Sequence, residues 1–458
     1  MPIATVNPAT GELVRSFPSM SPEEVEERLA LSAEAAREMR RTTFAQRAAW
    51  MRTAADLVTA ESRDTAGLLT EEMGKPITQA RAEVLKSART MRYYADHAED
   101  MLADQPLGDP AAVGASAAFT RYEPLGAVLA VMPWNFPMWQ VIRFAAPALM
   151  AGNVGLLKHA SNVPQTALYL DDLFARAGFP QGAFQTLLIG SSEVERIVRD
   201  RRVTAVTLTG SEPAGRAVAA VAASEVKKTV LELGGSDPFV VLPSADVQAA
   251  ARTAVAARTV NNGQSCVAAK RFIVHTDIYD AFVQAFVEGT KALVVGAPME
   301  ETTDVGPLAT ETGRRELVEL VEDAVSLGAR LRCGGAAIEG QGWFFEPAVL
   351  ENVTPEMRLY REEAFGPVAV ILRVADVEEA VSVANDTAFG LSSSVWTTDA
   401  DEERLLVEGL DAGAVFVNGM TVSHPELPFG GTKNSGIGRE LAAEGMREFC
   451  NLKAVWKG

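Results

Sequence analysis

Residues 203–235 read VTAVTLTGSEPAGRAVAAVAASEVKKTVLELGG and contain the pattern that decides the fold. We predict an apolar strand at 203–209, an alanine-rich helix at 214–223 and a second strand at 228–232. Apolar strands separated by helices are typical of a parallel sheet that is covered on both faces. Ligands bind beyond the carboxyl ends of such strands, so the polar residues that follow each strand are candidates for a binding site.

The same alternation extends in both directions along the chain. Upstream strands are predicted at 126–132 and 154–158, and a second α/β series starts near Gly234-Gly235. Before the first series, Ser21 and Glu24 form the capping box of the first of several amphipathic helices. The sequence therefore predicts an α/β fold with parallel sheets.

Composition narrows the classes of protein that fit this sequence. The 458 residues have a formal net charge of −18, and 48% of them are hydrophobic. This acidic balance argues against nucleic-acid binding, which needs a basic surface. No stretch reaches the roughly 20 apolar residues of a membrane helix, and the N-terminus has no signal-peptide pattern. The three cysteines lie far apart and no HExxH motif occurs, so we expect a cytoplasmic protein without a metal centre.

The stretch NNGQSC at 261–266 places Cys266 on a short polar turn after a predicted helix. Gly263 allows the backbone to take a positive φ or to approach another group closely. A cysteine presented on such a turn can act as a nucleophile in its thiolate form. Free cysteines are more often small buried hydrophobes, and for Cys266 alone that interpretation is favoured.

Two further stretches offer groups that can assist a nucleophile. PWNFP at 133–137 follows an apolar strand, and its prolines hold a turn in which the Asn135 amide can donate to an oxyanion. Asn is also a common turn former, so the motif alone supports both interpretations. Glu232 ends another apolar strand, where partial burial would raise its pKa and suit it to act as a general base. An exposed strand-end glutamate is the alternative.

Candidate groups for a nucleotide follow other strands. Lys158 and Ser161 end one strand, where a lysine can reach ribose hydroxyls or a phosphate. Gly210 and Ser211 lie between a strand and a helix. Ser211 can cap this helix, and the N-terminus of the helix can face a pyrophosphate. Neither a P-loop nor a Rossmann GxGxxG after a strand is present. EEAFGP at 362–367 adds a carboxylate and an aromatic ring. Each stretch alone is also compatible with an ordinary surface turn.

The motifs PWNFP, GSEPAG, ELGG, GQSC, EEAFGP and PFGGTKNSGIGRE occur in an order and approximate spacing that resemble the aldehyde dehydrogenase superfamily. The resemblance covers nearly the whole chain, and ELGG followed by GQSC is its most specific part. Within the superfamily the chain is most similar to succinate-semialdehyde dehydrogenases. The resemblance implies NAD(P)-dependent oxidation of an aldehyde to a carboxylic acid through a cysteine thioester.

The resemblance also implies roles for individual residues. Cys266 is expected to be the nucleophile, Glu232 the general base and Asn135 the oxyanion donor. Arg143 matches the arginine that holds the distal carboxylate of the substrate, although a structural arginine is the alternative. The expected cofactor-binding residues are Pro133, Trp134, Lys158, Ser161, Gly210, Ser211, Leu233, Glu363 and Phe365. The other expected substrate-binding residues are Trp139, Ser265 and Ser423.

Two departures from the family pattern bear on cofactor and substrate. Ser161 stands where NAD-preferring members usually carry glutamate, which leaves room for a nucleotide 2′-phosphate. We therefore expect NADP to be preferred, with NAD as a possible cofactor. Many succinate-semialdehyde dehydrogenases have a second arginine six residues before the nucleophile, where this chain has Val260. Another aliphatic or aromatic aldehyde is the alternative substrate.

The resemblance implies two α/β domains and a small β arm. The cofactor-binding domain is expected at 1–105 and 125–234, and the catalytic domain at 235–432. The arm and C-terminal segment, at 106–124 and 433–458, are expected to join subunits into homodimers or homotetramers.

Other expectations concern partners and alternative activities. The partner is a small aldehyde with a distal carboxylate, and neither nucleic acid nor a membrane is expected. Residues 119–124 are predicted to be an edge strand. A thiol esterase or acyltransferase without a redox cofactor remains open, although it needs a histidine partner, and His159 and His275 lie in no supporting motif. A non-catalytic relative is the third class.

Overall fold

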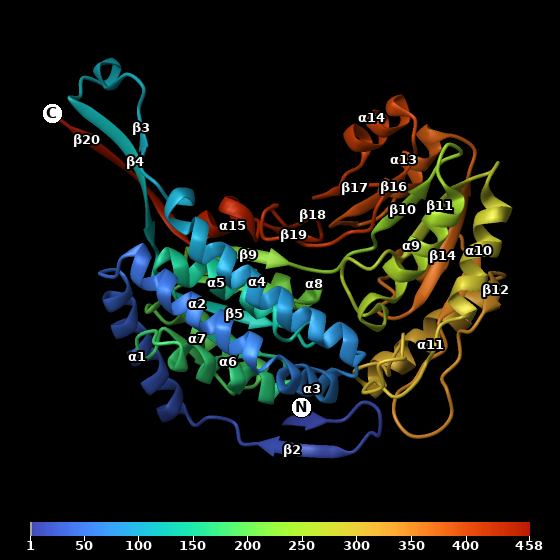
Figure 1. Cartoon of the computed structure of the whole chain (residues 1–458), viewed down its shortest axis with the longest axis horizontal. Coiled ribbons are helices and arrows are strands. Elements are labelled where there is room, and N and C mark those ends of the chain that lie inside the picture. Colours follow the sequence, from blue (N-terminus) through green and yellow to red (C-terminus); the bar gives the residue numbers. More distant parts are fainter. Residues whose placement is uncertain (1) are drawn as a thin grey trace.

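The computed structural model describes residues 2–458 (Figure 1). The chain starts with a hairpin of β1 (Ile3–Val6) and β2 (Leu13–Phe17). Four helices follow, α1 (Pro22–Met39), α2 (Phe44–Ala60), α3 (Ser62–Met73) and α4 (Ile77–Met101). The capping box predicted for α1 is present, because the Ser21 hydroxyl accepts the Glu24 N–H and the Glu24 carboxylate accepts the Ser21 N–H.

The first α/β unit is built on a six-stranded sheet with the strand order β19-β9-β8-β5-β6-β7. Its strands are β5 (Ala127–Met132), β6 (Val154–His159), β7 (Phe184–Thr186), β8 (Val203–Thr209), β9 (Lys228–Glu232) and β19 (Gly436–Ile437). Its helices are α5 (Trp139–Ala151), α6 (Pro164–Arg176), α7 (Val194–Arg199) and α8 (Glu212–Ser224). Strands β5 to β9 pair in parallel, so the segments that follow them meet at one edge of the sheet.

Helix α5 lies at the centre of the first unit, and all of its residues are buried, as its apolar sequence indicates. Glu83 of α4 caps this helix, because its Oε1 accepts the N–H groups of Met138 and Trp139, both at 2.9 Å. Glu83 is also paired with the buried Lys75. These contacts anchor the 133–137 turn, which connects β5 to α5, on α4.

The second α/β unit is built on a seven-stranded sheet with the order β12-β13-β14-β11-β10-β16-β17. Its strands are β10 (Pro238–Val241), β11 (Arg271–His275), β12 (Arg330–Cys333), β13 (Ala348–Glu351), β14 (Val368–Val374), β16 (Ser393–Trp396) and β17 (Val415–Val417). Its helices are α9 (Val247–Thr259), α10 (Tyr279–Lys291), α11 (Glu311–Ser326), α12 (Arg358–Arg361), α13 (Val377–Asn385) and α14 (Ala400–Gly409). Only β12 and β13 pair antiparallel in this sheet. The predicted α/β fold with parallel sheets is confirmed.

A three-stranded antiparallel arm projects from the first unit (Figure 1). It consists of β3 (Gln105–Pro106), β4 (Ala117–Pro124) and β20 (Cys450–Lys457). Because β4 lies between the other two strands, the prediction of an edge strand at 119–124 is wrong. Local sequence could not reveal this, since the partner strand β20 comes from the opposite end of the chain.

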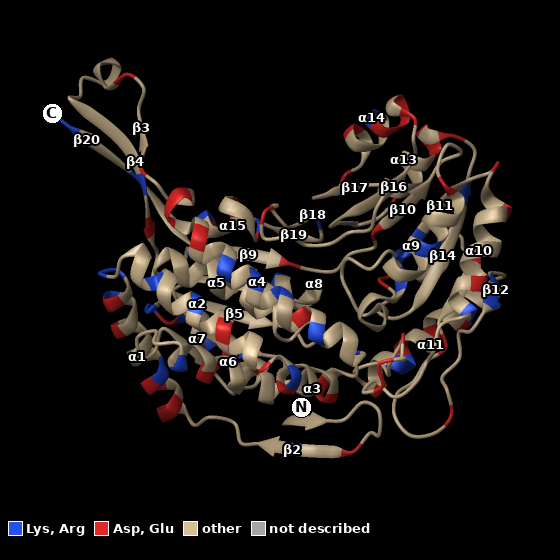
Figure 2. Cartoon of the chain, in the orientation of Figure 1, with Lys and Arg blue, Asp and Glu red and all other residues tan. Residues whose placement is uncertain are grey.

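The chain returns to the first unit after completing the second. β18 (Thr432–Lys433) pairs with β15 (Phe389–Gly390), β19 joins the first sheet beside β9, and α15 (Ala442–Glu448) packs on α4 and α5. Acidic and basic residues are interspersed over both units (Figure 2). Within residues 2–458, no helix has the length and apolar character required to cross a membrane.

Candidate active site

The cysteine stretch folds as a tight turn directly after α9. Asn261, Asn262 and Gly263 have positive φ angles of 55°, 59° and 71°. Asparagine tolerates this region better than most residues, which suits it to the first two positions. A Cβ at Gly263 would lie 2.5 Å from the backbone of Gly366, so the close approach predicted for this glycine is confirmed.

The two asparagines fasten the turn to neighbouring segments. Asn262 Nδ2 donates to the carbonyl oxygens of Gly74 and Pro307, both at 2.9 Å. Asn261 Nδ2 donates to the Asn135 carbonyl at 2.7 Å. The turn is therefore fixed relative to PWNFP. Sequence reasoning recorded both asparagines only as polar turn residues, because their partners lie far away in the chain.

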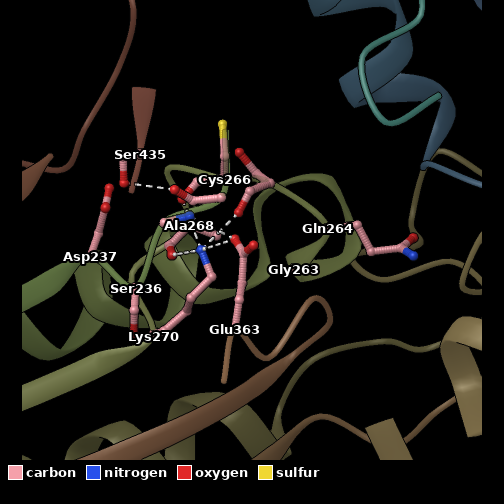
Figure 3. A network of polar contacts seen from close by, with 12 residues as sticks. Ser236, Asp237, Gly263, Gln264, Cys266, Ala268, Lys270, Glu363 and Ser435 are labelled. Carbon is pink, nitrogen blue, oxygen red and sulfur yellow. Dashed lines mark hydrogen bonds and ion pairs between the residues drawn. The ribbon is translucent and has the colours of Figure 1, made fainter. Parts of the chain in front are cut away.

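Lys270 holds the backbone around Cys266. Its Nζ donates to the carbonyl oxygens of Ser265, Cys266 and Ala268 at 3.1, 2.8 and 3.1 Å, and it pairs with Glu363 at 3.2 Å (Figure 3). The Cys266 sulfur points away from this network. Sequence reasoning missed Lys270, although a lysine within the apolar run AAKRFIV is the signal that could have found it.

Asn135 lies next to the cysteine turn and is 3% exposed. Its Nδ2 donates to the Gln264 carbonyl at 3.0 Å. An amide nitrogen carries two hydrogens, so one remains for a ligand oxygen. The backbone N–H of Cys266 has no acceptor within the described residues. Two donors are thus available beside the thiol.

Cys266 is partly exposed. Desolvation raises the pKa of its thiol to about 12, and the positive charges of Arg143 and Lys270 oppose this increase only in part. At neutral pH the unliganded protein therefore carries the protonated thiol, whereas the thiolate is the nucleophilic form.

We expect alkylation of Cys266 by iodoacetamide to accelerate about tenfold per pH unit between pH 7 and pH 10 without reaching a plateau. The thiolate fraction grows in this proportion as long as the pH stays below the thiol pKa. Peptide mass spectrometry measures the rate at Cys266 separately from the rates at Cys333 and Cys450. A plateau near pH 8 would contradict a raised pKa.

Glu232 ends β9 and is 2% exposed, so the alternative of an exposed glutamate is wrong. Neither of its carboxylate oxygens has a hydrogen-bond partner within residues 2–458. Burial raises the pKa of Glu232 well above its usual range; Arg143 opposes this shift and Glu440 reinforces it. A buried carboxyl with free oxygens and a raised pKa is suited to general-base work.

The candidate nucleotide-binding residues gather at the carboxyl edge of the first sheet. Pro133 and Trp134 follow β5, Gly210 and Ser211 follow β8, and Leu233 follows β9. Ser211 occupies the N-cap position of α8, but the expected capping hydrogen bond from its side chain is absent. The first N–H groups of α8 therefore remain available to a ligand.

Lys158 and Ser161 lie at the end of β6. Lys158 is 8% exposed, and burial lowers the pKa of its amine. We find no side-chain hydrogen bond or ion pair of Lys158 in the part of the chain that is described. A largely buried amine without a partner is suited to bind a polar ligand. Ser161 is partly exposed beside it.

Glu363 and Phe365 approach this edge from the second unit. Glu363 Oε1 accepts the Gly235 N–H at 3.1 Å as well as pairing with Lys270. The rings of Phe365 and Trp134 meet edge to face, with centroids 5.7 Å apart. The candidate cofactor residues of the two units therefore face one another.

Arg143 is buried in the first unit, with 2% of its surface exposed. Its Nε is paired with the carboxylate of Glu440, and its Nη2 donates to Thr209 Oγ1 at 3.2 Å. The guanidinium carbon lies 4.6 Å from the centroid of the Phe429 ring. Sequence reasoning quoted Glu440 within a motif but assigned it no role.

The other candidate substrate residues divide between a cavity and the protein interior. Trp139 lines a cavity of about 610 Å³ between α4 and α9. Ser423 follows Val422, which lines this cavity, and its hydroxyl accepts a hydrogen bond from Lys86 Nζ at 2.7 Å. Ser265, by contrast, is part of the cysteine turn and is completely buried.

Neither His159 nor His275 forms a hydrogen bond with Cys266. His159 is buried, its ring nitrogens contact the carbonyl oxygens of Met132 and Pro137, and desolvation lowers its pKa to about 4. His275 lies at the end of β11, next to Asp277. The histidine–cysteine pair that a thiol hydrolase needs is therefore not formed.

Comparison with known proteins agrees with this geometry. The profile of the aldehyde dehydrogenase family matches residues 1–455. The chain belongs to this family. A Mycolicibacterium paratuberculosis protein named succinate-semialdehyde dehydrogenase, NADP(+), is 61% identical over 459 residues, which cover 100% of this chain and 97% of that protein. Succinate-semialdehyde dehydrogenase, NADP(+), 1 of Mycobacterium tuberculosis H37Rv is 60% identical, with 100% of both chains covered.

A solved structure shows the same fold. The succinic semialdehyde dehydrogenase of Streptococcus pyogenes, crystallised with NADP+ as the cofactor, superposes with a TM-score of 0.96. It is 34% identical and the match covers 99% of each chain. The family predicted from the sequence motifs is confirmed, and with it the oxidoreductase class.

Proposed function

We propose that this aldehyde dehydrogenase oxidises succinate semialdehyde to succinate with NADP+ as the hydride acceptor. The observation that carries the proposal is the convergence of a thiol, an amide donor and a buried carboxylate at Cys266, Asn135 and Glu232. The neutral Ser161 after β6 supports the choice of cofactor. The two mycobacterial relatives, at 61% and 60% identity, carry this activity and cofactor in their names and support the choice of substrate.

The residues at the carboxyl edge of the first sheet fit a dinucleotide phosphate. Lys158 and Ser161 would hold the adenosine ribose and its 2′-phosphate, because the unpaired amine supplies positive charge and the serine adds no negative charge. The free N-terminus of α8 at Ser211 would bind the pyrophosphate. Glu363 would accept a hydrogen bond from the nicotinamide ribose, and the Trp134–Phe365 pair would border the ring.

The reaction starts at Cys266. The partly exposed thiol releases its proton to solvent. The thiolate then attacks the aldehyde carbon, so that a C–S bond forms and the carbonyl electrons move to oxygen. The resulting oxyanion accepts the free N–H of the Asn135 amide and the backbone N–H of Cys266. Removing one such donor typically costs about 10²–10³ in kcat. NADP+, when bound, accepts the hydride from this carbon.

Loss of the hydride restores the carbonyl group and leaves a thioester on Cys266. Glu232 then takes a proton from water, and the water oxygen adds to the thioester carbon. The C–S bond breaks, the sulfur leaves as the thiolate, and the carboxylic acid is released. A carboxyl whose pKa is raised is a stronger base once it is ionised, which suits this step.

Ser161→Glu is expected to lower kcat/KM for NADP+ by about 10²-fold or more, because placing two like charges together costs several kcal/mol. The value for NAD+ should fall little or rise, since a carboxylate there can accept a ribose hydroxyl. Initial rates with both cofactors measure the two effects, and Ser161→Gln is the uncharged control of equal size. Equal losses for both cofactors would mean that Ser161 does not face the 2′-phosphate.

The direct test of the function is the absorbance of the reduced cofactor with succinate semialdehyde and with uncharged aldehydes. We expect the fastest turnover with succinate semialdehyde and NADP+. A preference for an uncharged aliphatic or aromatic aldehyde would leave the family assignment intact and overturn the substrate. Absence of cofactor reduction with every aldehyde would overturn the function.

We also infer a division of labour along the chain and a homo-oligomeric assembly. Residues 1–105 and 125–234 form the cofactor domain in this proposal, 235–432 the catalytic domain, and 106–124 with 433–458 the arm and C-terminal segment. Leu452 and Trp456 of β20 are 54% and 58% exposed, which suits a surface that a second subunit covers. Gel filtration with light scattering distinguishes monomer, dimer and tetramer. The cytoplasmic location stays a prediction.

A further inference from the structure

The junction between α3 and α4 lies where the two α/β units meet (Figure 1). Gly74 ends α3 with a φ of 80°, and a Cβ there would lie 2.8 Å from the Pro307 carbonyl oxygen. Glycine therefore allows the backbone to pass this close to the second unit. In the first turn of α4, the side chain of Gln79 accepts the N–H of Asn261 at 2.7 Å. Together with the hydrogen bond from Asn262 to Gly74, this contact fastens the junction to the cysteine turn.

A buried ion pair belongs to the same segment. Lys75 is completely buried, and Glu83, in the second turn of α4, is 4% exposed. The pair forms through Glu83 Oε2, which leaves Oε1 for other partners. Oε1 accepts the N–H groups of Met138 and Trp139, and Lys75 Nζ lies 4.3 Å from the centroid of the Phe136 ring. Both members of the pair therefore contact the segment directly after the oxyanion donor.

The oxyanion donor completes a closed set of contacts. The Asn135 amide donates to the Gln264 carbonyl, and the Asn135 carbonyl accepts a hydrogen bond from Asn261. Three segments are thus linked in pairs: the junction to the cysteine turn, the cysteine turn to PWNFP, and PWNFP back to the junction through the ion pair. In this arrangement a displacement at the ion pair changes the position of Asn135 relative to Cys266.

Stability alone does not account for two charges at this place. The desolvation of two ions is costly, and the exchange of a buried ion pair for apolar residues of similar volume is often neutral or stabilising. What the pair supplies is a fixed direction. Each carboxylate oxygen of Glu83 has its own partners, and Lys75 has no other hydrogen-bond acceptor in residues 2–458. A carboxylate held from both sides keeps the first N–H groups of α5 in one position.

We propose that Lys75 and Glu83 are positioning residues that hold the Asn135 amide where it donates to the oxyanion formed at Cys266. They act through the main chain of residues 136–139, and Asn135 makes the contact with the substrate oxygen. This inference rests on the proposed function, because it concerns the formation of the same thioester. It gives the α3–α4 junction a role in catalysis in addition to its place in the scaffold.

The first experiment exchanges the pair for uncharged residues of similar size. Rapid mixing with NADP+ and the aldehyde that the wild type oxidises fastest measures the rate constant of cofactor reduction in the first turnover. Lys75→Met/Glu83→Met should lower this rate constant by about 10²-fold, because a displacement of about 1 Å at a reacting group has an effect of this size. Affinity for NADP+, measured by calorimetry, should change far less, since the pair lies outside the candidate cofactor residues.

A second variant keeps the test decisive if the first does not fold. In Lys75→Met/Glu83→Gln the amide oxygen can still accept the N–H groups of Met138 and Trp139, but no cation fixes its direction. We expect this variant to lose about tenfold in the same rate constant, the effect of one weakened hydrogen bond. The smaller loss with glutamine than with methionine would show that the anchor on the main chain carries the effect.

A double-mutant cycle shows whether the effect passes through Asn135. Asn135→Ala alone should lower the rate constant by about 10²–10³-fold, as expected for the removal of an oxyanion donor. Adding Lys75→Met/Glu83→Gln to Asn135→Ala should cause little further loss, because the amide that the pair positions is no longer present. A pair that only stabilised the protein would lower the rate constant by the same factor in both backgrounds.

Alkylation of Cys266 by iodoacetamide provides a readout that should not change. The thiolate displaces iodide in this reaction, and no oxyanion forms that needs Asn135. Both ion-pair variants should therefore be alkylated at the wild-type rate, whereas a displaced cysteine turn would alter it. The matched control is the ion pair between Arg332 of β12 and Glu351 of β13 in the second sheet. Arg332→Met/Glu351→Gln should keep the wild-type rate constant of cofactor reduction.

Each outcome decides the role of the pair. An unchanged rate constant in Lys75→Met/Glu83→Gln would overturn the positioning role. An equal loss in the presence and absence of Asn135, or a loss that alkylation of Cys266 shares, would assign the pair to the general stability of the site and also overturn it. In both cases the wild type would still oxidise the aldehyde, so the proposed function would stand. A wild-type enzyme that reduces no cofactor would overturn the proposed function and this role together.

Discussion

Cys266→Ala is expected to lower aldehyde-dependent reduction of NADP+ by at least about 10⁴-fold, because the covalent pathway through the thioester is lost altogether. No other thiol can replace it. Cys333 lies on β12 in the second unit, and Cys450 is buried at the start of the arm strand β20. The absorbance of the reduced cofactor measures the loss directly.

Two controls make this result specific. Cys333→Ala removes a partly exposed thiol outside the site and should retain wild-type turnover. The Cys266→Ala variant should still bind NADP+, because the cofactor contacts come from other residues. Calorimetry measures this binding. Turnover in Cys266→Ala above about one part in 10⁴ of the wild-type value would exclude Cys266 as the nucleophile.

Glu232→Gln is expected to stop the reaction after the first turnover. Glutamine has the size of glutamate but cannot accept a proton from water, so the thioester should form and then persist. Steady-state turnover should fall about 10²–10⁴-fold, the usual contribution of general-base catalysis. Rapid mixing should still show a burst of reduced cofactor equal to the enzyme concentration, and mass spectrometry should detect the acyl group on Cys266.

The pH dependence of hydrolysis provides an independent check. Because burial raises the pKa of Glu232, its carboxylate becomes populated only as the pH increases through that raised value. Hydrolysis of the acyl-enzyme by the wild type should therefore accelerate with increasing pH until Glu232 is ionised, whereas the slow rate in Glu232→Gln should lack this dependence. A Glu232→Gln variant without a burst would place Glu232 before the thioester, in contradiction to its role as the hydrolytic base.

Much of the site could be predicted from local sequence because the strand ends carry it. The apolar strands and the polar segments that follow them placed Asn135, Lys158, Ser211 and Glu232 at one edge of a parallel sheet, and the structure brings them there. The conformational freedom of glycine predicted a close backbone approach at Gly263, before the cysteine. The structure shows this approach, to the backbone of Gly366. These features depend on residues near one another in the chain.

The features that local sequence could not predict depend on pairs brought together by folding. β4 lies inside its sheet because β20 covers it from the other end of the chain. Lys270 supports the cysteine turn through three carbonyl oxygens, a contact that residue spacing does not indicate. Hydrogen bonds of this kind arise only when distant segments enclose a buried polar group.

The alternation of strands and helices, the capping box and the order of the motifs predicted the family and the sheet edge, because local propensity and hydrophobic period act over short stretches. The same motifs led to the proposal of Cys266 as the nucleophile. The state of each charge was settled by folding. Arg143 reads as a free cation in the sequence, yet Glu440 neutralises it in the interior. Lys86 reads as an ordinary helix lysine, yet it meets Ser423, 337 residues away, and no carboxylate lies within ion-pair distance of it in residues 2–458. The strength and availability of a charge depend on burial and on partners across space, and these exist only in the folded chain.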